Sequence, residues 1–372
     1  MSKAAELAKM GEVLTNSQLG GRRNIVINGA MQCSQRSTSA TSITSTGYHA
    51  LDRFKLLYTD AGTWTMSQSS TAPNGFANSL KLDCTSAKSS LASDSRLFLM
   101  QLIEAQDLQQ LKKGTSESEY VTLSFYVRSN KTGTYQVNIE DNDNVRIIGS
   151  TYTISSADTW ERKVIPFVGD TSGTLPDDTG DGFNIMWALV AGTDNSSGAV
   201  PTAWESKVNT DRGAGLGVNL ADSTDNEWYI TGVQLEVGNY PGGTPFEHRS
   251  FGEELALCQR YFNIFGKAET GNNYENFGTV VAFGTGAGDH RMQMTMPTTM
   301  RAIPTVGNSG SFACIGQVDG GGQLSSIGLA DGGSKTIIGL NLTMNAGNVV
   351  GDVSPFRSNN DADAFISFDA EL

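Results

Sequence analysis

The chain has 372 residues, a formal net charge of -13 at pH 7 and a sequence pI of about 4.7. An acidic surface repels phosphate backbones and anionic headgroups, which argues against nucleic-acid binding and against insertion into or adhesion to a membrane. A neutral or cation-bridged glycan, or another protein, is a better partner. Charged residues are only 17% of the chain and glycines number 42, a turn-rich composition typical of β-sandwiches.

The length predicts two domains, each with its own core, and a short tail. No apolar run approaches the roughly 18 residues of a membrane-spanning helix, and no secretion signal is expected at residues 1–14. The cysteines are widely separated and match no zinc-binding spacing. We therefore expect reduced, buried thiols at Cys33, Cys84, Cys258 and Cys314.

Residues 1–23 begin with a predicted short helix in which Leu7, Ala8 and Leu14 recur at roughly helical spacing. A helix of this length does not persist alone in water, so its apolar stripe needs a partner. That partner would be symmetry mates on a three-fold axis or a socket on a larger particle. The alternative is a frayed terminus.

Residues 24–240 are predicted to form one β-rich domain with a helical turn at 107–113. Its clearest strand is 121–127, where apolar and polar residues alternate. About ten strands without long intervening helices indicate antiparallel sheets rather than a parallel α/β fold. The expected strands are 25–31, 49–58, 63–68, 79–83, 97–104, 121–127, 133–140, 145–152, 161–167, 183–190 and 228–237.

The segment 226–262 joins this domain to the next. Period-two alternation predicts that Tyr229, Thr231, Val233, Leu235 and Val237 share one side of a strand. A Pro/Gly-rich break follows, and the pattern then becomes helical. The segment 241–266 is therefore predicted to hold a linker and a connecting helix, with one apolar stripe made of Phe251, Leu255, Cys258 and Phe262.

Residues 267–372 are predicted to form a smaller β domain with glycine-rich turns. Met292, Met294 and Met296 share one strand face and are expected in its core. The expected strands are 279–283, 291–296, 305–307, 312–317, 334–344 and 364–371. The predicted fold class is all-β: a short N-terminal helix, an antiparallel jelly-roll sandwich, a connecting helix and a second, smaller β-sandwich.

Several segments together resemble tail fibres and related virion proteins of tailed bacteriophages, especially those of marine phages. The most specific are GVQLEVG, TPFEHRSFGEELALCQRYF and MPTTMRAIPTV. The others, in chain order, are GRRNIVINGAMQCSQR, YHALDRF, TLSFYVRSNKTGTY, ADTWERKVIPF and FISFDAEL. The resemblance spans nearly the whole chain. It implies a virion part with a jelly roll like that of carbohydrate-binding modules, usually trimeric, and it does not imply an enzyme.

Two acidic loops are candidates for a structural calcium ion, which takes several oxygen ligands from a flexible loop. Neither follows the EF-hand frame, but the resemblance to carbohydrate-binding jelly rolls, many of which carry calcium, supports a site. Solvated hairpin tips are the preferred interpretation, and a calcium site is the alternative. The candidate ligands are Asp141, Asp143, Asp177, Asp178 and Asp181.

No catalytic constellation is visible. His49, His248 and His290 are the only histidines and lie in no metal-binding or catalytic spacing, and neither a GxSxG elbow nor a P-loop is present. Glycoside hydrolysis remains an alternative because two carboxylates suffice for it. Phage chains that cleave polysaccharide usually show the period of a long strand-rich solenoid, which this sequence lacks.

Glycan recognition uses aromatic faces, so tryptophan and tyrosine residues in turns, polar loops and linkers are the candidate contacts. They are Trp64, Trp204, Tyr240 and Tyr274. We predict a receptor-binding virion protein, made in the host bacterial cytoplasm, that binds host surface polysaccharide through trimeric avidity. Its N-terminal segment would attach to other virion proteins and its C-terminal domain would face the receptor. The alternative is a structural connector, decoration or appendage subunit.

Overall fold

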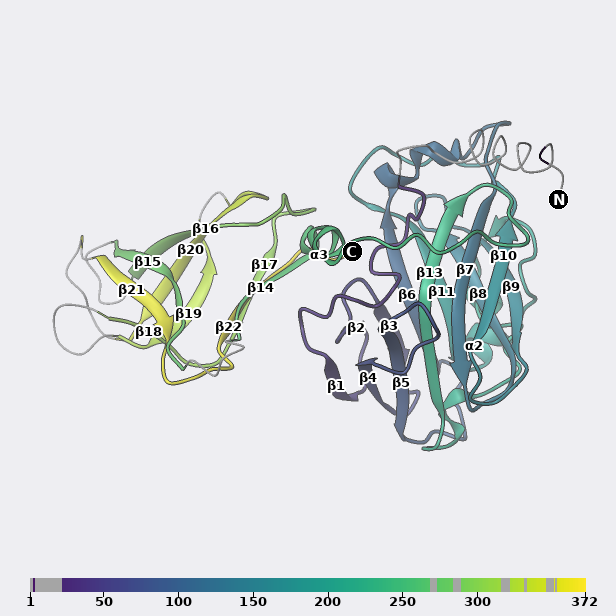
Figure 1. The fold of residues 1–372 in the computed structure, drawn as a ribbon, viewed down its shortest axis with the longest axis horizontal. Helices are drawn as coiled ribbons and strands as arrows, with labels where there is room; N and C mark the ends of the chain where they lie inside the picture. The colour runs from purple at the N-terminus through teal and green to yellow at the C-terminus, as the bar shows by residue number, and fades with distance from the viewer. Residues whose placement is uncertain are drawn as a thin grey trace. The chain divides into compact units, whose positions relative to one another are not determined.

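The structure is a computed structural model that describes Lys3 and residues 22–267, 273–283, 289–315, 322–330, 333–345, 351 and 353–372. The chain is all-β and antiparallel, as predicted (Figure 1). It divides into an N-terminal unit, Met1–Glu254, and a C-terminal unit, Leu255–Leu372. The dividing point lies inside helix α3 (Phe251–Gln259), within the predicted linker segment 241–266. The predicted attachment residues Leu7, Ala8 and Leu14 lie outside the described residues.

The N-terminal unit is a sandwich of two antiparallel sheets with short helical turns at its ends. Its strands are β1 (Ser39–Ile43), β2 (Gly47–Tyr48), β3 (Lys55–Thr59), β4 (Thr63–Ser69), β5 (Ser79–Ser86), β6 (Arg96–Glu104), β7 (Val121–Ser129), β8 (Gly133–Asp141), β9 (Arg146–Ile154), β10 (Glu161–Phe167), β11 (Asp181–Ala191), β12 (Glu205–Ser206) and β13 (Glu227–Val237). The helical turns are η1 (Ala105–Leu111), α2 (Thr193–Ser196), η2 (Asn209–Asp211) and η3 (Leu220–Asp222).

Sheet A has the strand order β1-β4-β5-β13-β7-β10, and sheet B has the order β12-β9-β8-β11-β6-β3-β2. Several neighbouring strands, such as β5 and β13 or β6 and β11, are distant in sequence, as in a jelly roll. The inner faces of both sheets supply one core with several fully buried aromatic rings. The largest of them are Trp64, Trp187, Trp228, Phe125 and Tyr135.

A β-bulge in β13 changes the face on which its side chains lie. The register with β7 shifts between Thr231 and Gln234, and Gly232 has a left-handed φ of 62°. Trp228, Ile230, Val233 and Leu235 therefore point into the core. The prediction that Tyr229 and Thr231 share the core side with Val233 was wrong, because strict alternation fails across the bulge.

Replacing Gly232 with alanine is expected to destabilise the N-terminal unit by about 1–3 kcal/mol. The new Cβ would lie 2.7 Å from a ring carbon of Phe76 and 2.9 Å from one of Tyr126, in a backbone conformation that favours glycine. Chemical denaturation measures the change. Gly242→Ala is the control, since nothing lies within 4 Å of that position, and equal stabilities of the two variants would contradict the prediction.

The C-terminal unit contains two further antiparallel sheets. Sheet C has the order β14-β22-β17 and sheet D the order β18-β21-β15-β16-β20-β19. The strands are β14 (Phe262–Gly266), β15 (Asn276–Ala282), β16 (Asp289–Thr295), β17 (Thr305–Ser309), β18 (Phe312–Cys314), β19 (Leu324–Leu329), β20 (Ile337–Met344), β21 (Val353–Ser358) and β22 (Phe365–Asp369). Met292, Met294 and Met296 are buried in its core, as predicted.

Helix α3 is shorter than predicted. It ends at Gln259, and Phe262 begins β14 instead of completing the helical stripe. Phe251, the first residue of that stripe, is exposed, whereas Glu254 is buried and pairs with Arg249. All four cysteines are buried and free, as expected. Among the described residues, no helix has the length and apolar character needed to cross a bilayer.

Candidate functional site

The four aromatic residues predicted to contact a glycan lie in different environments. Trp64 was a wrong prediction: its side chain is fully buried on the core side of β4, and its indole N–H donates to the carbonyl of Ala61 at 2.7 Å. Alternation along β4 places it there. Tyr274, in the C-terminal unit, is 45% exposed, and the Arg357 guanidinium lies 4.5 Å from its ring centroid.

The other two candidates are half-buried parts of the N-terminal unit. The Trp204 indole packs 5.7 Å from the Phe183 ring centroid and donates its N–H to the carbonyl of Val168 at 2.7 Å. The Tyr240 ring lies against the backbone at Gly238, where a Cβ would approach it to 2.6 Å. Both rings therefore serve local packing, and the four candidates do not form one aromatic platform.

The predicted calcium loops approach each other, but a lysine supplies the positive charge there. The Lys113 ammonium lies 2.5 Å from Asp141 Oδ2 and 3.2 Å from Asp170 Oδ2. It also donates to the carbonyls of Ser172 and Gly173, each at 2.8 Å. Two carboxylates and two carbonyls thus surround a nitrogen cation, in a set of oxygen groups that would otherwise suit a hard metal ion.

The remaining predicted ligands do not complete a metal site. Asp178 accepts the backbone N–H of Gly180 at 2.8 Å, and Asp181 accepts a hydrogen bond from Asn142 at 2.5 Å. Burial, and then the nearby charges of Asp141, Asp178 and Asp181, raise the pKa of Asp143. Over the part of the chain that the structure describes, no group of three or more His, Cys, Asp or Glu side chains is arranged to hold a metal ion. The assignment of Asp141, Asp143, Asp177, Asp178 and Asp181 to a calcium site is therefore corrected.

The outer face of sheet B is closed by the chain itself. Residues 197–217, which we call the covering segment, lie over it. Arg212 of this segment donates to both carboxylate oxygens of Glu140 on β8, at 2.6 and 3.1 Å. Gln136 and Asn138, on the same face of β8, bond to backbone carbonyls of the covering segment. All three β8 side chains are buried, so the covering segment closes the outer face of sheet B over this strand.

The polar groups on the outer face of sheet A are largely paired with one another. Lys81 binds Glu227 at 2.5 Å, and Tyr229 donates to the same carboxylate at 2.6 Å. The Trp160 ring packs edge-on against Tyr229, with centroids 6.1 Å apart, and Arg128 lies over the Tyr229 ring. These contacts satisfy the groups that a ligand would otherwise use.

More large hydrophobic residues are exposed in the described part of the C-terminal unit than in that of the N-terminal unit, although the N-terminal unit is larger. Of the thirteen exposed large hydrophobic residues in the described part of the chain, eight belong to the C-terminal unit and five to the N-terminal unit. The eight are Tyr274, Val281, Phe283, Ile303, Ile315, Leu329, Ile337 and Val353. Val281 and Val353 are direct partners across β15 and β21, so the outer face of sheet D is partly apolar and open.

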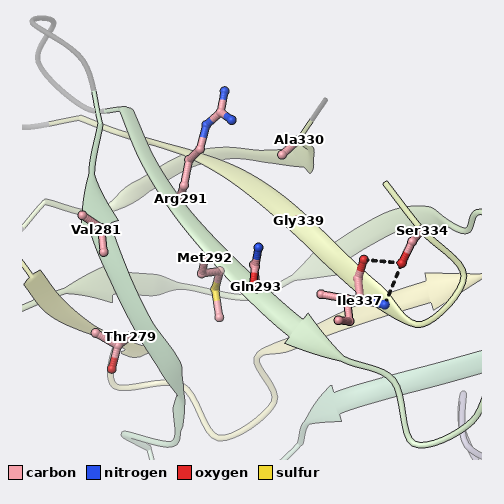
Figure 2. Close-up of a pocket in the computed structure, with 9 residues that line it drawn as sticks. All are labelled: Thr279, Val281, Arg291, Met292, Gln293, Ala330, Ser334, Ile337 and Gly339. Carbon is pink, nitrogen blue, oxygen red and sulfur yellow. Dashed lines mark hydrogen bonds between the residues drawn. The ribbon is translucent and has the colours of Figure 1, made fainter. Parts of the chain in front are cut away.

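A groove of about 580 Å³ lies on this outer face of sheet D (Figure 2). Its volume is within the usual range for ligand sites, roughly 300–1,000 Å³. The lining residues are Thr279, Val281, Arg291, Met292, Gln293, Ala330, Ser334, Ile337 and Gly339. They come from β15, β16, β20 and the turns beside β20 (Figure 2).

Strand alternation places the polar groups of the groove. Because Met292 and Met294 face the core, their neighbours Arg291 and Gln293 project to the outer face. Gln293 lies opposite Gly339, and the lack of a side chain there keeps the floor of the groove low. The Ser334 hydroxyl bonds to the backbone of Ile337 and shapes the rim (Figure 2).

The groove holds polar groups that have no protein partner among the described residues. The guanidinium of Arg291 lies 4.6 Å from the Phe283 ring centroid and forms no ion pair with a described carboxylate. The side chains of Gln293 and Thr279 are exposed and make no hydrogen bond within the described ranges. None of the nine described lining residues is Asp, Glu, His or Cys, so these nine supply binding groups but no general acid or base.

Sequence reasoning had placed the methionines of β16 correctly but had not used the opposite face of that strand. The same alternation that buries Met292 and Met294 exposes Arg291 and Gln293. The signal in the sequence was therefore the set of polar residues on one face of a strand whose apolar face is predicted to lie in the core.

No protein-family model matches the sequence, and no curated protein matches it. Among solved structures, the chain is similar to the enzymatically active domain of bacteriophage CBA120 tailspike protein 4, with 14% identity, 57% of this chain and 21% of that chain covered, and a TM-score of 0.29. It thus spans about a fifth of that tailspike chain.

Two carbohydrate-binding modules are also similar. The family 11 module of Clostridium thermocellum in complex with a β-1,3-1,4-mixed-linked tetrasaccharide has 11% identity, 55% and 96% coverage of the two chains, and a TM-score of 0.27. A family 61 module in complex with β-1,4-galactotriose has 11% identity, 58% and 99% coverage, and a TM-score of 0.26. Likenesses at these TM-scores carry no argument about what this chain binds.

Proposed function

We propose that this chain is a non-catalytic, glycan-binding protein of a bacteriophage virion, and that its C-terminal unit contacts the host receptor. The observation that carries the proposal is the open groove on sheet D, which combines exposed apolar side chains with polar groups that have no partner among the described residues. Sugars present hydroxyl groups and apolar C–H faces together, and a groove with both kinds of group suits them.

The location of the groove supports binding by the C-terminal unit rather than by the jelly roll. In the jelly roll, the covering segment closes the outer face of sheet B, and ion pairs engage the polar groups on sheet A. The virion arrangement that we propose is a homotrimer held at its N-terminal end by other virion proteins. Several copies of a weak site then bind a repetitive surface polysaccharide by avidity.

Adsorption to bacteria tests this function. Purified, fluorescently labelled full-length protein is incubated with a panel of candidate host strains, and light scattering gives the oligomeric state of the same sample. We expect saturable binding by a trimer to at least one strain, competed by that strain's purified surface polysaccharide. The same polysaccharide should gain no reducing ends on incubation. Absence of binding to every strain that the parent phage infects would reject the receptor-binding function, and release of reducing ends would reject the non-catalytic assignment.

A structural virion subunit is the second candidate function. The covering segment favours it, because a jelly roll whose outer sheet face is covered is suited to a structural role rather than to ligand binding. A protein that binds no strain but co-assembles with a tail or adaptor protein of the virion would support this alternative.

A further inference from the structure

We infer that the groove on sheet D selects an acidic glycan, and that Arg291 binds the sugar carboxylate. This inference rests on the proposed function and specifies its substrate class. Among the nine described residues that line the groove, one carries a formal charge, the guanidinium of Arg291.

The charge of the surroundings makes Arg291 unusual. The chain has 39 acidic residues against 26 basic ones, and buried arginines such as Arg212 pair with a carboxylate. Arg291 is exposed and forms no ion pair within the described part of the chain. A cation without an ion-pair partner among the described residues of so acidic a protein attracts an external anion, and a carboxylate is the anion that acidic surface sugars supply.

The position of Phe283 prepares the guanidinium for that contact. Its ring lies under the guanidinium, with 4.6 Å between the guanidinium carbon and the ring centroid. A cation–π contact does not use the N–H donors of the guanidinium, so they stay available for a bidentate carboxylate contact. The ring contact already restricts the Arg291 side chain before binding. Less side-chain conformational entropy is therefore lost when the sugar binds.

The rest of the groove suits a sugar ring. Gln293 and Thr279 offer an amide and a hydroxyl for sugar hydroxyls, and neither has a hydrogen-bond partner among the described residues. Val281 and Ile337 are 44% and 49% exposed and offer apolar surface to the C–H face of the ring. A neutral sugar would use these groups alone, whereas an acidic sugar adds a charge-assisted pair.

A second copy of this chain is the other occupant that an open sheet face could take. The groove favours a small polar ligand instead, because it is hollowed over Gly339 and contains a guanidinium. A dry interface between identical copies would have to desolvate that guanidinium without an acidic residue from the groove itself. Self-association through this face is therefore an outcome that the test must be able to reveal.

The test uses full-length protein and the acidic surface polysaccharide of an adsorbing strain, both native and with its carboxyl groups chemically reduced to alcohols. We expect reduction to weaken binding by wild-type protein about tenfold or more. Arg291→Gln should weaken binding of the native polymer by a similar factor and become insensitive to carboxyl reduction. Arg291→Lys should fall between the two, since lysine keeps the charge but loses the planar fork.

Arg357→Gln is the matched control, because Arg357 also stacks on an aromatic ring in the C-terminal unit but does not line the groove. It should bind like wild type. Three results would overturn the inference while leaving glycan binding intact. They are equal binding of native and reduced polymer by the wild-type protein, wild-type affinity in Arg291→Gln, and adsorption only through a neutral polysaccharide. A lower oligomeric state of Arg291→Gln in light scattering would instead assign the groove to self-association. Failure of the wild-type chain to bind any polysaccharide would overturn the proposed function and this inference together.

Discussion

Replacing Lys113 with methionine is expected to lower the free energy of unfolding of the N-terminal unit by about 3–5 kcal/mol. The Lys113 side chain is 2% exposed, and its carboxylate partners on Asp141 and Asp170 are 0% and 3% exposed. Arg146 still binds Asp170 at 2.6 Å in the variant, so the uncompensated charge is mainly that of Asp141. A buried carboxylate without a cation costs several kcal/mol, and the carbonyls of Ser172 and Gly173 lose their donor as well.

Urea denaturation of wild type, Lys113→Met and Lys112→Met measures the effect. Lys112 is the neighbouring residue, but its ammonium is exposed and pairs only with the exposed Glu119 and Glu117, so its removal should leave stability essentially unchanged. Adding Asp141→Asn to Lys113→Met should recover much of the loss, because it removes the orphaned charge. A Lys113→Met variant as stable as Lys112→Met would show that the ammonium is not the cation of this site.

Replacing Arg212 with alanine is expected to cost about 3–5 kcal/mol and to release the covering segment from sheet B. Arg212 makes the bidentate contact with Glu140, and both side chains are almost fully buried. Lys207 lies 3.6 Å from the same carboxylate and compensates it only partly. The variant also removes a cation from the Phe98 ring, which lies 5.4 Å from the guanidinium carbon.

Hydrogen exchange distinguishes release of the segment from general destabilisation. The amides of Gly213 and Gly215, which donate to Asn195 and Gln136, should lose protection before the strands of sheet B do. Lys88→Ala serves as a control, since its ion pair with Asp60 is exposed and is worth about 0–1 kcal/mol. Uniform loss of protection in Arg212→Ala would mean that the segment and the sheet open as one unit.

Sequence patterns predicted the strands whose alternation is regular. Residues 121–127 and 161–167 were expected as strands and lie in β7 and β10. Residues 25–31 were expected as a strand and instead turn at Asn28, whose φ is 59° and whose side chain bonds to the backbone of Cys33 and Asp52. A side chain that satisfies backbone groups locally does not alter the hydrophobic pattern, so the pattern could not reveal it.

Other differences depend on tertiary contacts. At the bulge at Gly232, the side chains of β13 change faces relative to strict alternation. Only the pairing with β7 fixes the position of the bulge. Strands β19 and β21 were not predicted, because Leu324–Leu329 and Val353–Ser358 are rich in serine and alternate weakly.

The candidate site was the least predictable part of the molecule. Trp64 was predicted as a glycan contact because it follows a turn, but its position within β4 sends its ring into the core. The groove combines side chains from β15, β16 and β20, which are far apart in the sequence. No local motif marks such a surface, because its parts meet only when sheet D forms.

The most direct test of the account is to observe which unit the glycan contacts. Full-length protein with ¹³C-labelled methionine methyl groups is titrated with the surface polysaccharide of an adsorbing strain, and the methyl resonances are followed by NMR. Met292 is among the residues that line the groove, although its side chain faces the core on the other side of β16, whereas Met66 is in the core of the N-terminal unit and Met186 lies beneath Arg212 of the covering segment. The account predicts a saturable shift of the Met292 resonance with Met66 and Met186 unchanged. A shift at Met186 with Met292 unaffected would place the ligand on sheet B of the jelly roll and contradict it.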